Sequence, residues 1–216
     1  MTIPVLSSLS AALRSGCRVS VPILLAAIAL GGCSFDLGSF SSGSDKEDPA
    51  KPAPAGVAVA EAQVYATHGQ VLAKSGKTEE ALAEFNRAIE LDPNNAQALY
   101  GRGLLYQGEK QHQLAIDDFT AAYGLKPQQA EPLLGRAVSY LAIDKVKEAA
   151  ADLDEAVQAD PQNAQIWSTR GQAYERLGDK PKAAESYGRA INLRPGDEAA
   201  RNGLARVGGK TDRSRT

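Results

Sequence analysis

Large apolar, small and polar positions recur in a fixed order every 34 residues from residue 62 onward. The pattern occurs in four copies, which start at Ala62, Ala96, Ala130 and Ala164. In each copy the fourth, eighth and eleventh positions hold a large, a small and a large residue, and this spacing places them on one helical face. A second run occupies positions twenty, twenty-four and twenty-seven. The pattern therefore predicts two amphipathic helices per copy and a fold built by stacking these pairs.

The columns of this repeat combine small and large side chains. The small residues are Gly69, Gly103, Ala137 and Gly171 at position eight, Ala81, Ala115, Ala149 and Ala183 at position twenty, and Ala88, Ala122, Ala156 and Ala190 at position twenty-seven. The large residues are Tyr65, Leu99, Leu133 and Trp167 at position four, Leu72, Tyr106, Tyr140 and Tyr174 at position eleven, and Phe85, Phe119, Leu153 and Tyr187 at position twenty-four. Small residues let two helices approach closely, while the large ones fill the adjoining gaps.

Turn and helix-end residues punctuate the pattern. Proline recurs at position thirty-two, where it ends the second helix because it lacks the N–H that a helix interior needs. Thr78 is expected to cap a second helix and Pro181 to open one. After the last copy, Asp197 is expected to cap a short helix over residues 198–207, which covers the apolar face of the last hairpin. Residues 208–216 form a polar tail.

The columns resemble the tetratricopeptide repeat, with every signature column filled over the repeats 62–95, 96–129, 130–163 and 164–197. The resemblance implies an all-α fold for residues 61–207, namely a right-handed superhelical solenoid of four helical hairpins plus a C-terminal capping helix. It also implies a concave groove lined by positions two, five, nine and twelve of each first helix. The candidate groove residues are Tyr100, Leu104, Gln107, Leu134, Val138, Leu141 and Gln172.

The groove positions are apolar in the middle copies and polar at both ends, an order that resembles a protein-binding surface with a polar rim. The alternative is that Leu134, Val138 and Leu141 pack against the next hairpin. The groove lacks the Lys and Asn pattern with which chaperone-binding members hold a C-terminal carboxylate. The residues at those positions are Ala66, Gln70, Gly101, Glu131 and Gly135.

A charged row accompanies the columns. Arginine recurs at position seven (Arg102, Arg136, Arg170), and an acid recurs at position twenty-three of the first three copies (Glu84, Asp118, Asp152). Because the arginine row and the acidic row run in parallel through the repeats, we expect ion pairs between the helices of the hairpins. A row of phosphate-binding arginines is the alternative.

The first sixty residues carry a different signal. Arg14 and Arg18 precede an apolar run over residues 21–30, an order typical of a signal peptide. The run falls short of the roughly 20 apolar residues that a membrane-spanning helix needs. The segment Leu30-Gly31-Gly32-Cys33 resembles the lipobox of bacterial lipoproteins.

The lipobox resemblance implies that residues 1–32 are removed and that Cys33 is lipidated on its thiol and its new amino group. Several acyl chains hold a protein on a membrane more firmly than one chain does. Ser34 after the cysteine implies, by the same resemblance, an outer membrane location facing the periplasm. Residues 33–60 then comprise the lipidated cysteine and a flexible linker. The alternatives are an ordinary cleaved signal and an apolar core segment.

Composition narrows the function. Without Arg14 and Arg18 the chain has 22 basic and 26 acidic residues, a net charge of −4 that argues against nucleic-acid binding. Its two cysteines precede the repeats, so a disulfide framework there is excluded. His68 and His112 lack neighbouring metal ligands. We also find no nucleophile with a base and no carboxylate pair.

We therefore expect a non-enzymatic protein without a cofactor, metal or small-molecule substrate. It is expected to act as a membrane-anchored adaptor of the bacterial cell envelope that binds protein partners through its groove. By family resemblance, such lipoproteins recruit cell-wall hydrolases or assist pilus and secretion assembly. A stoichiometric structural subunit of an envelope complex is the alternative.

Overall fold

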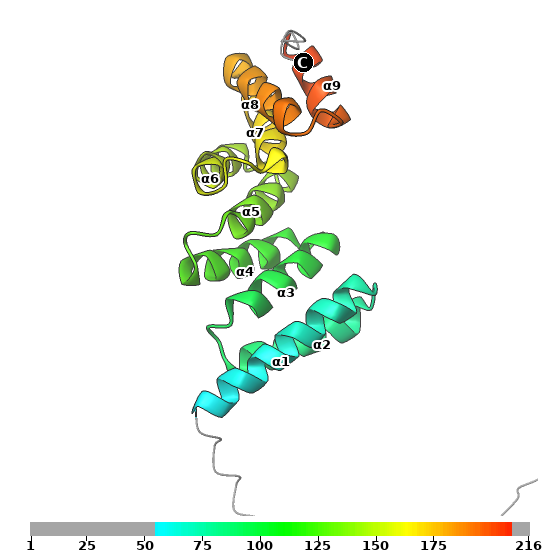
Figure 1. The fold of residues 1–216 in the computed structure, drawn as a ribbon, viewed down its shortest axis with the longest axis vertical. Helices are drawn as coiled ribbons and strands as arrows, with labels where there is room; N and C mark the ends of the chain where they lie inside the picture. Colours follow the sequence, from blue (N-terminus) through cyan, green and yellow to red (C-terminus); the bar gives the residue numbers. More distant parts are fainter. Residues whose placement is uncertain (1–54, 209–216) are drawn as a thin grey trace, which may run out of the picture. The chain divides into compact units, whose positions relative to one another are not determined.

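The computed structural model describes residues 55–208, in which every regular element is a helix (Figure 1). Four helical hairpins follow one another in this range. They are α1 (Ala55–Lys74) with α2 (Thr78–Leu91), α3 (Ala96–Gly108) with α4 (His112–Leu125), α5 (Ala130–Ala142) with α6 (Val146–Ala159), and α7 (Ala164–Arg176) with α8 (Lys180–Leu193). A last helix, α9 (Glu198–Arg206), packs against α7 and α8. The predicted fold class, an all-α solenoid of hairpins with a C-terminal capping helix, is confirmed.

Each hairpin stacks on the one before it through its first helix, which contacts both helices of the preceding pair. The alanine columns at positions twenty and twenty-seven are at most 1% exposed, and they let the two helices of a hairpin approach closely. The core therefore runs along the whole stack instead of forming one central cluster, as expected of a solenoid.

The side chains at position twenty-four are fully buried, and three of them are aromatic rings held between two glycines. A Cβ added at Gly69 would lie 2.8 Å from the Cε1 atom of Phe85, and one added at Gly101 would lie 2.4 Å from its Cζ atom. Gly69 belongs to the same hairpin as Phe85, whereas Gly101 belongs to the next. Phe119 lies likewise between Gly103 and Gly135, and Tyr187 between Gly171 and Gly203. Phe85 and Phe119 thus join consecutive hairpins, and Tyr187 joins the last hairpin to α9.

The third copy follows the same rule with different residues. Leu153 replaces the ring at position twenty-four, and the two flanking positions hold Ala137 and Thr169 instead of glycine. All three side chains are buried. A smaller side chain at the centre is thus accompanied by larger ones on both sides, which preserves the packed volume.

The arginines of position seven bind across hairpin boundaries. Arg102 donates from Nε and Nη2 to the two carboxylate oxygens of Asp118, at 2.8 and 2.7 Å, and from Nη1 to Asn86 of the preceding hairpin at 2.8 Å. Arg136 makes the equivalent contacts with Asp152 and Thr120. The expected ion pairs within these two hairpins are confirmed.

The fourth and first hairpins depart from this pairing. Position twenty-three of the fourth hairpin is Ser186, so Arg170 donates to its hydroxyl and forms its ion pair with Asp154 of the preceding hairpin at 2.7 Å. In the first hairpin, His68 takes the place of arginine, and its Nδ1 lies 3.2 Å from Glu84. The guanidinium groups are therefore engaged by the protein itself, which disfavours the phosphate-binding alternative.

Helix ends match the sequence expectations in part. Asp197 accepts a hydrogen bond from the Ala200 amide at 2.9 Å and caps α9, and Pro181 stands in the first turn of α8. The expected cap at Thr78 is wrong. Thr78 is already the first residue of α2, and Lys77 precedes it without a side-chain capping bond. The capping helix covers the last hairpin as expected, with Ala200 and Leu204 buried.

The first helix begins earlier than the repeat. α1 starts at Ala55, so the linker expected over residues 33–60 is shorter at its C-terminal end. The physical reason is that residues 55–61 contain no proline and their one glycine, Gly56, lies in the first turn, so the helix continues upstream from Ala62. The expected signal peptide, Cys33 and the rest of the linker lie outside the described residues, as do residues 209–216 of the tail. No helix in residues 55–208 combines the length and the apolar character needed to cross a bilayer.

Candidate functional site

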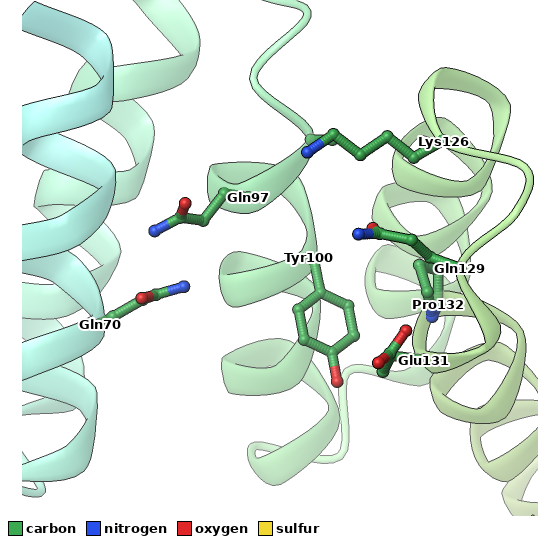
Figure 2. Close-up of a pocket in the computed structure, with 8 residues that line it drawn as sticks. Gln70, Gln97, Tyr100, Lys126, Gln129, Glu131 and Pro132 are labelled. Carbon is green, nitrogen blue, oxygen red and sulfur yellow. The ribbon is translucent and has the colours of Figure 1, made fainter. Parts of the chain in front are cut away.

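A hollow of ≈ 300 Å³ lies among three successive first helices, α1, α3 and α5, and the loop before α5 (Figure 2). Its lining residues are Gln70, Ala96, Gln97, Tyr100, Lys126, Gln129, Glu131 and Pro132. Gln97 and Glu131 occupy position two of their copies, Tyr100 position five and Gln70 position nine. These are positions that the family resemblance assigns to the concave groove. The hollow is thus lined by groove positions of three adjacent hairpins together with the loop before α5.

Amide groups face the hollow from both sides. The amide of Gln63 donates to the Oε1 of Gln97 at 2.8 Å and connects α1 with α3. Figure 2 shows the side chains of Gln70 and Gln97 pointing toward one another from these helices. Within residues 55–208, the side chains of Gln70 and Gln129 have no hydrogen-bond partner. An amide group both donates and accepts, so these two side chains can bind a peptide group of a ligand.

Tyr100 forms the apolar floor between these amides. Its ring lies 5.8 Å from that of Phe119, centroid to centroid, at a tilt of 49°. Burial raises the pKa of the Tyr100 hydroxyl, and the nearby charge of Glu131 raises it further. The hydroxyl therefore stays protonated at neutral pH and is available as a hydrogen-bond donor.

Two opposite charges flank the hollow. Lys126 lies in the loop between α4 and α5, and Glu131 lies in the first turn of α5. In the described part of the chain, neither side chain forms an ion pair. One positive and one negative group give the lining of the hollow no net charge.

The apolar candidates divide into two groups. Leu134 and Leu141 are half-buried and pack against the core, which supports the packing alternative for these two residues. Leu104 is 42% exposed, and it follows Tyr100 by one turn of α3. Val138 is half-buried on α5. Only Leu104 among these four residues offers a largely accessible apolar side chain.

The two polar candidates, Gln107 and Gln172, also differ in their surroundings. The amide nitrogen of Gln107 lies 2.7 Å from the carbonyl oxygen of Gly135 and 2.7 Å from the hydroxyl of Ser139, so it ties α3 to α5. Gln172 is exposed on α7 and lies outside the hollow. Of the candidate groove residues, Tyr100 alone lines the hollow.

Sequence reasoning did not select two loop residues of the hollow. Lys126 and Gln129 stand between the helices, where the repeat columns give no guidance. Gln70, Gln97 and Glu131 were assigned to groove positions but were not selected as candidates. The signal in the sequence that connects these three residues is that each stands at one of the groove positions. No group of three potential metal ligands occurs in residues 55–208.

Models of the tetratricopeptide repeat family match residues within the helical stack. A family model described as TPR repeat matches residues 69–110, and models described as Tetratricopeptide repeat match residues 96–129 and 134–207. Residues 69–129 and 134–207 therefore carry tetratricopeptide repeats. None of the curated proteins matches the chain.

Solved structures share the fold. YrrB, described as a TPR protein with an unusual peptide-binding site, is 22% identical with a TM-score of 0.60, over 66% of this chain and 74% of its own. The pilF protein of Pseudomonas aeruginosa is 20% identical with a TM-score of 0.63, over 70% of this chain and 69% of its own. The first TPR of Spaghetti (RPAP3), bound to an HSP90 peptide, is 26% identical with a TM-score of 0.52, over 54% and 93%.

Proposed function

From the tetratricopeptide repeats of this chain, we propose that it is a membrane-anchored adaptor of the bacterial envelope that binds a protein partner in its groove. Cys33 carries the lipid anchor, and residues 34–54 connect it to the helical stack. The outer membrane, with the repeats facing the periplasm, is the proposed location. Its proposed role is either recruitment of cell-wall hydrolases or assistance in pilus or secretion assembly.

The observation that carries the binding function is the hollow around Tyr100. Three adjacent first helices contribute amide, hydroxyl and charged groups to it, and the side chains of Gln70 and Gln129, which have no hydrogen-bond partner within residues 55–208, are available to a ligand. An extended peptide suits this arrangement because its backbone presents donors and acceptors at regular intervals. Leu104 adds an accessible apolar contact on the same helix as Tyr100.

Two structural neighbours support a peptide as ligand. YrrB is described with a peptide-binding site, and the RPAP3 repeat is described in complex with the HSP90 peptide SRMEEVD. That peptide is acidic and ends in a carboxylate. The hollow of this chain has one lysine and one glutamate, so we propose that it binds an internal, largely uncharged segment instead of an acidic C-terminus.

Site-specific photo-crosslinking in cells tests the groove. A photoreactive amino acid at Leu104 or Gln97 should capture a discrete protein partner. The matched control position is Leu114, which is 47% exposed on α4. Capture of the same protein from Leu114 with equal yield would contradict the groove as binding site.

The anchor has its own test, since it lies outside the described residues. We expect Cys33→Ser to move the protein from the detergent phase to the aqueous phase in a phase-partition experiment. Cys17→Ser is the control and should leave the partition unchanged. A Cys33→Ser variant that still partitions into detergent like the parent would show that the anchor assignment is wrong.

A further inference from the structure

The outer face of α1 carries an apolar stripe. Val57, Val64 and Val71 follow one another at seven-residue intervals, and they are 45%, 68% and 56% exposed. A seven-residue interval keeps side chains on one side of a helix, as in two-stranded coiled coils. Ala60 and Thr67 lie beside the valines on the same side, and both are exposed. Small residues there allow another helix to approach closely.

The same face is buried in all later copies. Val64 stands at position three, where Ala98 of α3, Ile166 of α7 and Ala200 of α9 are 0% exposed and Pro132 of α5 is buried. They are buried because each of those helices contacts a preceding hairpin. Within residues 55–208, α1 contacts only α2 and α3, and Figure 1 shows it at one end of the stack. At the other end, α9 covers the last hairpin.

The preceding sequence holds no further copy that would cover this face. A repeat placed 34 residues before Ala62 would need alanine at residues 47 and 54, but Glu47 and Pro54 stand there. A helix with an apolar stripe of its own would complement this face. The outer face of α1 in another molecule is such a stripe.

We propose that a second copy of this chain docks on the outer face of α1, with the two α1 helices antiparallel. Antiparallel packing places Val57 of each molecule opposite Val71 of the other and Glu61 near His68, so the valines pair along the stripe and no like charges meet. Parallel packing would place the two Lys74 side chains next to each other, which costs free energy. A two-fold contact of this kind also closes, which limits assembly to a dimer.

Cysteine cross-linking tests the contact. The repeats contain no cysteine, so Val64→Cys in the full chain with Cys17→Ser and Cys33→Ser introduces one thiol. A short bifunctional thiol reagent should link Val64→Cys molecules about tenfold or more faster than Leu114→Cys molecules, because docking raises the effective thiol concentration. Equal rates at the two positions would overturn the proposal.

The orientation and the energetics are tested separately. A mixture of Val57→Cys and Val71→Cys molecules should cross-link faster than Val57→Cys alone, whereas a faster reaction of Val57→Cys alone would overturn the antiparallel arrangement. Val64→Lys with Val71→Lys should convert the dimer to a monomer in sedimentation experiments while the circular dichroism spectrum is unchanged. Capture of a partner from Leu104 should persist in this variant. Failure of this dimer is thereby distinguished from failure of the groove.

Discussion

At the scale of single residues, the close contact between a ring and two glycines determines how the hairpins stack. Phe85 touches Gly69 in its own hairpin and Gly101 in the next, so one side chain sets the spacing within and between hairpins. A Cβ at either glycine would overlap the ring. Interiors packed this tightly respond strongly to one added methyl group.

This contact gives the first prediction, Gly101→Ala. Its Cβ would lie 2.4 Å from the Phe85 ring, so we expect a loss of about 1 to 3 kcal/mol in the free energy of unfolding. Gly188→Ala on α8 is the matched control, because a Cβ there has no atom within 4 Å. The control should be neutral or stabilising by about 0.5 to 1 kcal/mol, since alanine is the better helix former. Urea denaturation of both variants measures the difference, and equal stabilities would contradict the close contact between Gly101 and the Phe85 ring.

The repeat columns predicted the core residues well because each column has one geometric role. All eight alanines of positions twenty and twenty-seven are buried, as expected. The pairing of Phe85 with Gly101 was not predicted, because position six was not among the columns considered. The columns also could not distinguish a side chain that faces the groove from one that connects two helices. Gln107 stands at a groove position, yet its amide bonds to α5 instead of facing a ligand.

At the scale of helices, the arginines of position seven connect three helices each. Arg136 binds Asp152 in the second helix of its own hairpin and Thr120 in the hairpin before it. The side chains of Arg136 and Asp152 are only 14% and 10% exposed, so removing one partner leaves a poorly solvated charge.

Asp152→Ala is therefore predicted to destabilise the stack by about 1 to 3 kcal/mol, as expected for a lost hydrogen bond to a charged group. Arg87→Ala is the control. It removes an ion pair with Glu90 on the surface of α2, where both side chains are more than half exposed, and should change stability little. Thermal unfolding followed by circular dichroism compares the two variants. Equal shifts in Tm would show that the buried ion pair contributes no more to stability than the exposed one.

The capping helix is held by a pH-sensitive contact. Arg206 of α9 donates two hydrogen bonds to Glu175 of α7, at 2.6 and 2.9 Å, and the hydroxyl of Tyr187 donates a third at 2.6 Å. The hydrogen bond from Arg206 lowers the pKa of Glu175, the one from Tyr187 adds to this, and burial opposes both. The folded pKa thus lies below the unfolded value of about 4.3.

The sign of the pH effect follows from that shift. The contribution of Glu175 to stability is fully present above pH 4.3 or so and is lost as the pH falls through the lower folded pKa. Glu175→Gln should therefore lose stability at neutral pH and lose less than the parent on acidification. Glu185→Gln on the exposed side of α8 is the control and should follow the parent. If stability falls with pH in parallel for Glu175→Gln and the parent, Glu175 does not cause the loss of stability at acidic pH.

The start of α1 illustrates what periodicity cannot provide. Residues 55–61 precede the first repeat column, so no column predicted a helix there, and their Ala, Gly and Val composition resembled the linker. In the chain they continue α1 by seven residues before Ala62. A run of seven residues is too short to be stable as an isolated helix, so we attribute its helical state to propagation from the hairpin downstream.

At the scale of the whole helical stack, buried contacts between hairpins are separate from the accessible surface that is available for binding. Positions twenty-four and seven join hairpins through buried contacts, whereas the first helices leave Tyr100, Leu104 and the amides of the hollow accessible. Because stability and binding rest on different residues, a substitution in one set should leave the other property largely intact.

Changing Leu104 and Val138 together to serine is the last prediction. Leu104 is 42% exposed and Val138 is half-buried, so the double variant should lose only about 1 kcal/mol of stability. Partner capture should weaken about tenfold or more if these side chains are central contacts of the groove. Phe119→Ala is the contrasting variant. It removes a fully buried ring and should cost about 3 to 5 kcal/mol in the free energy of unfolding. If the double variant melts like Phe119→Ala, both positions belong to the core, and the binding surface would be confined to the hollow around Tyr100.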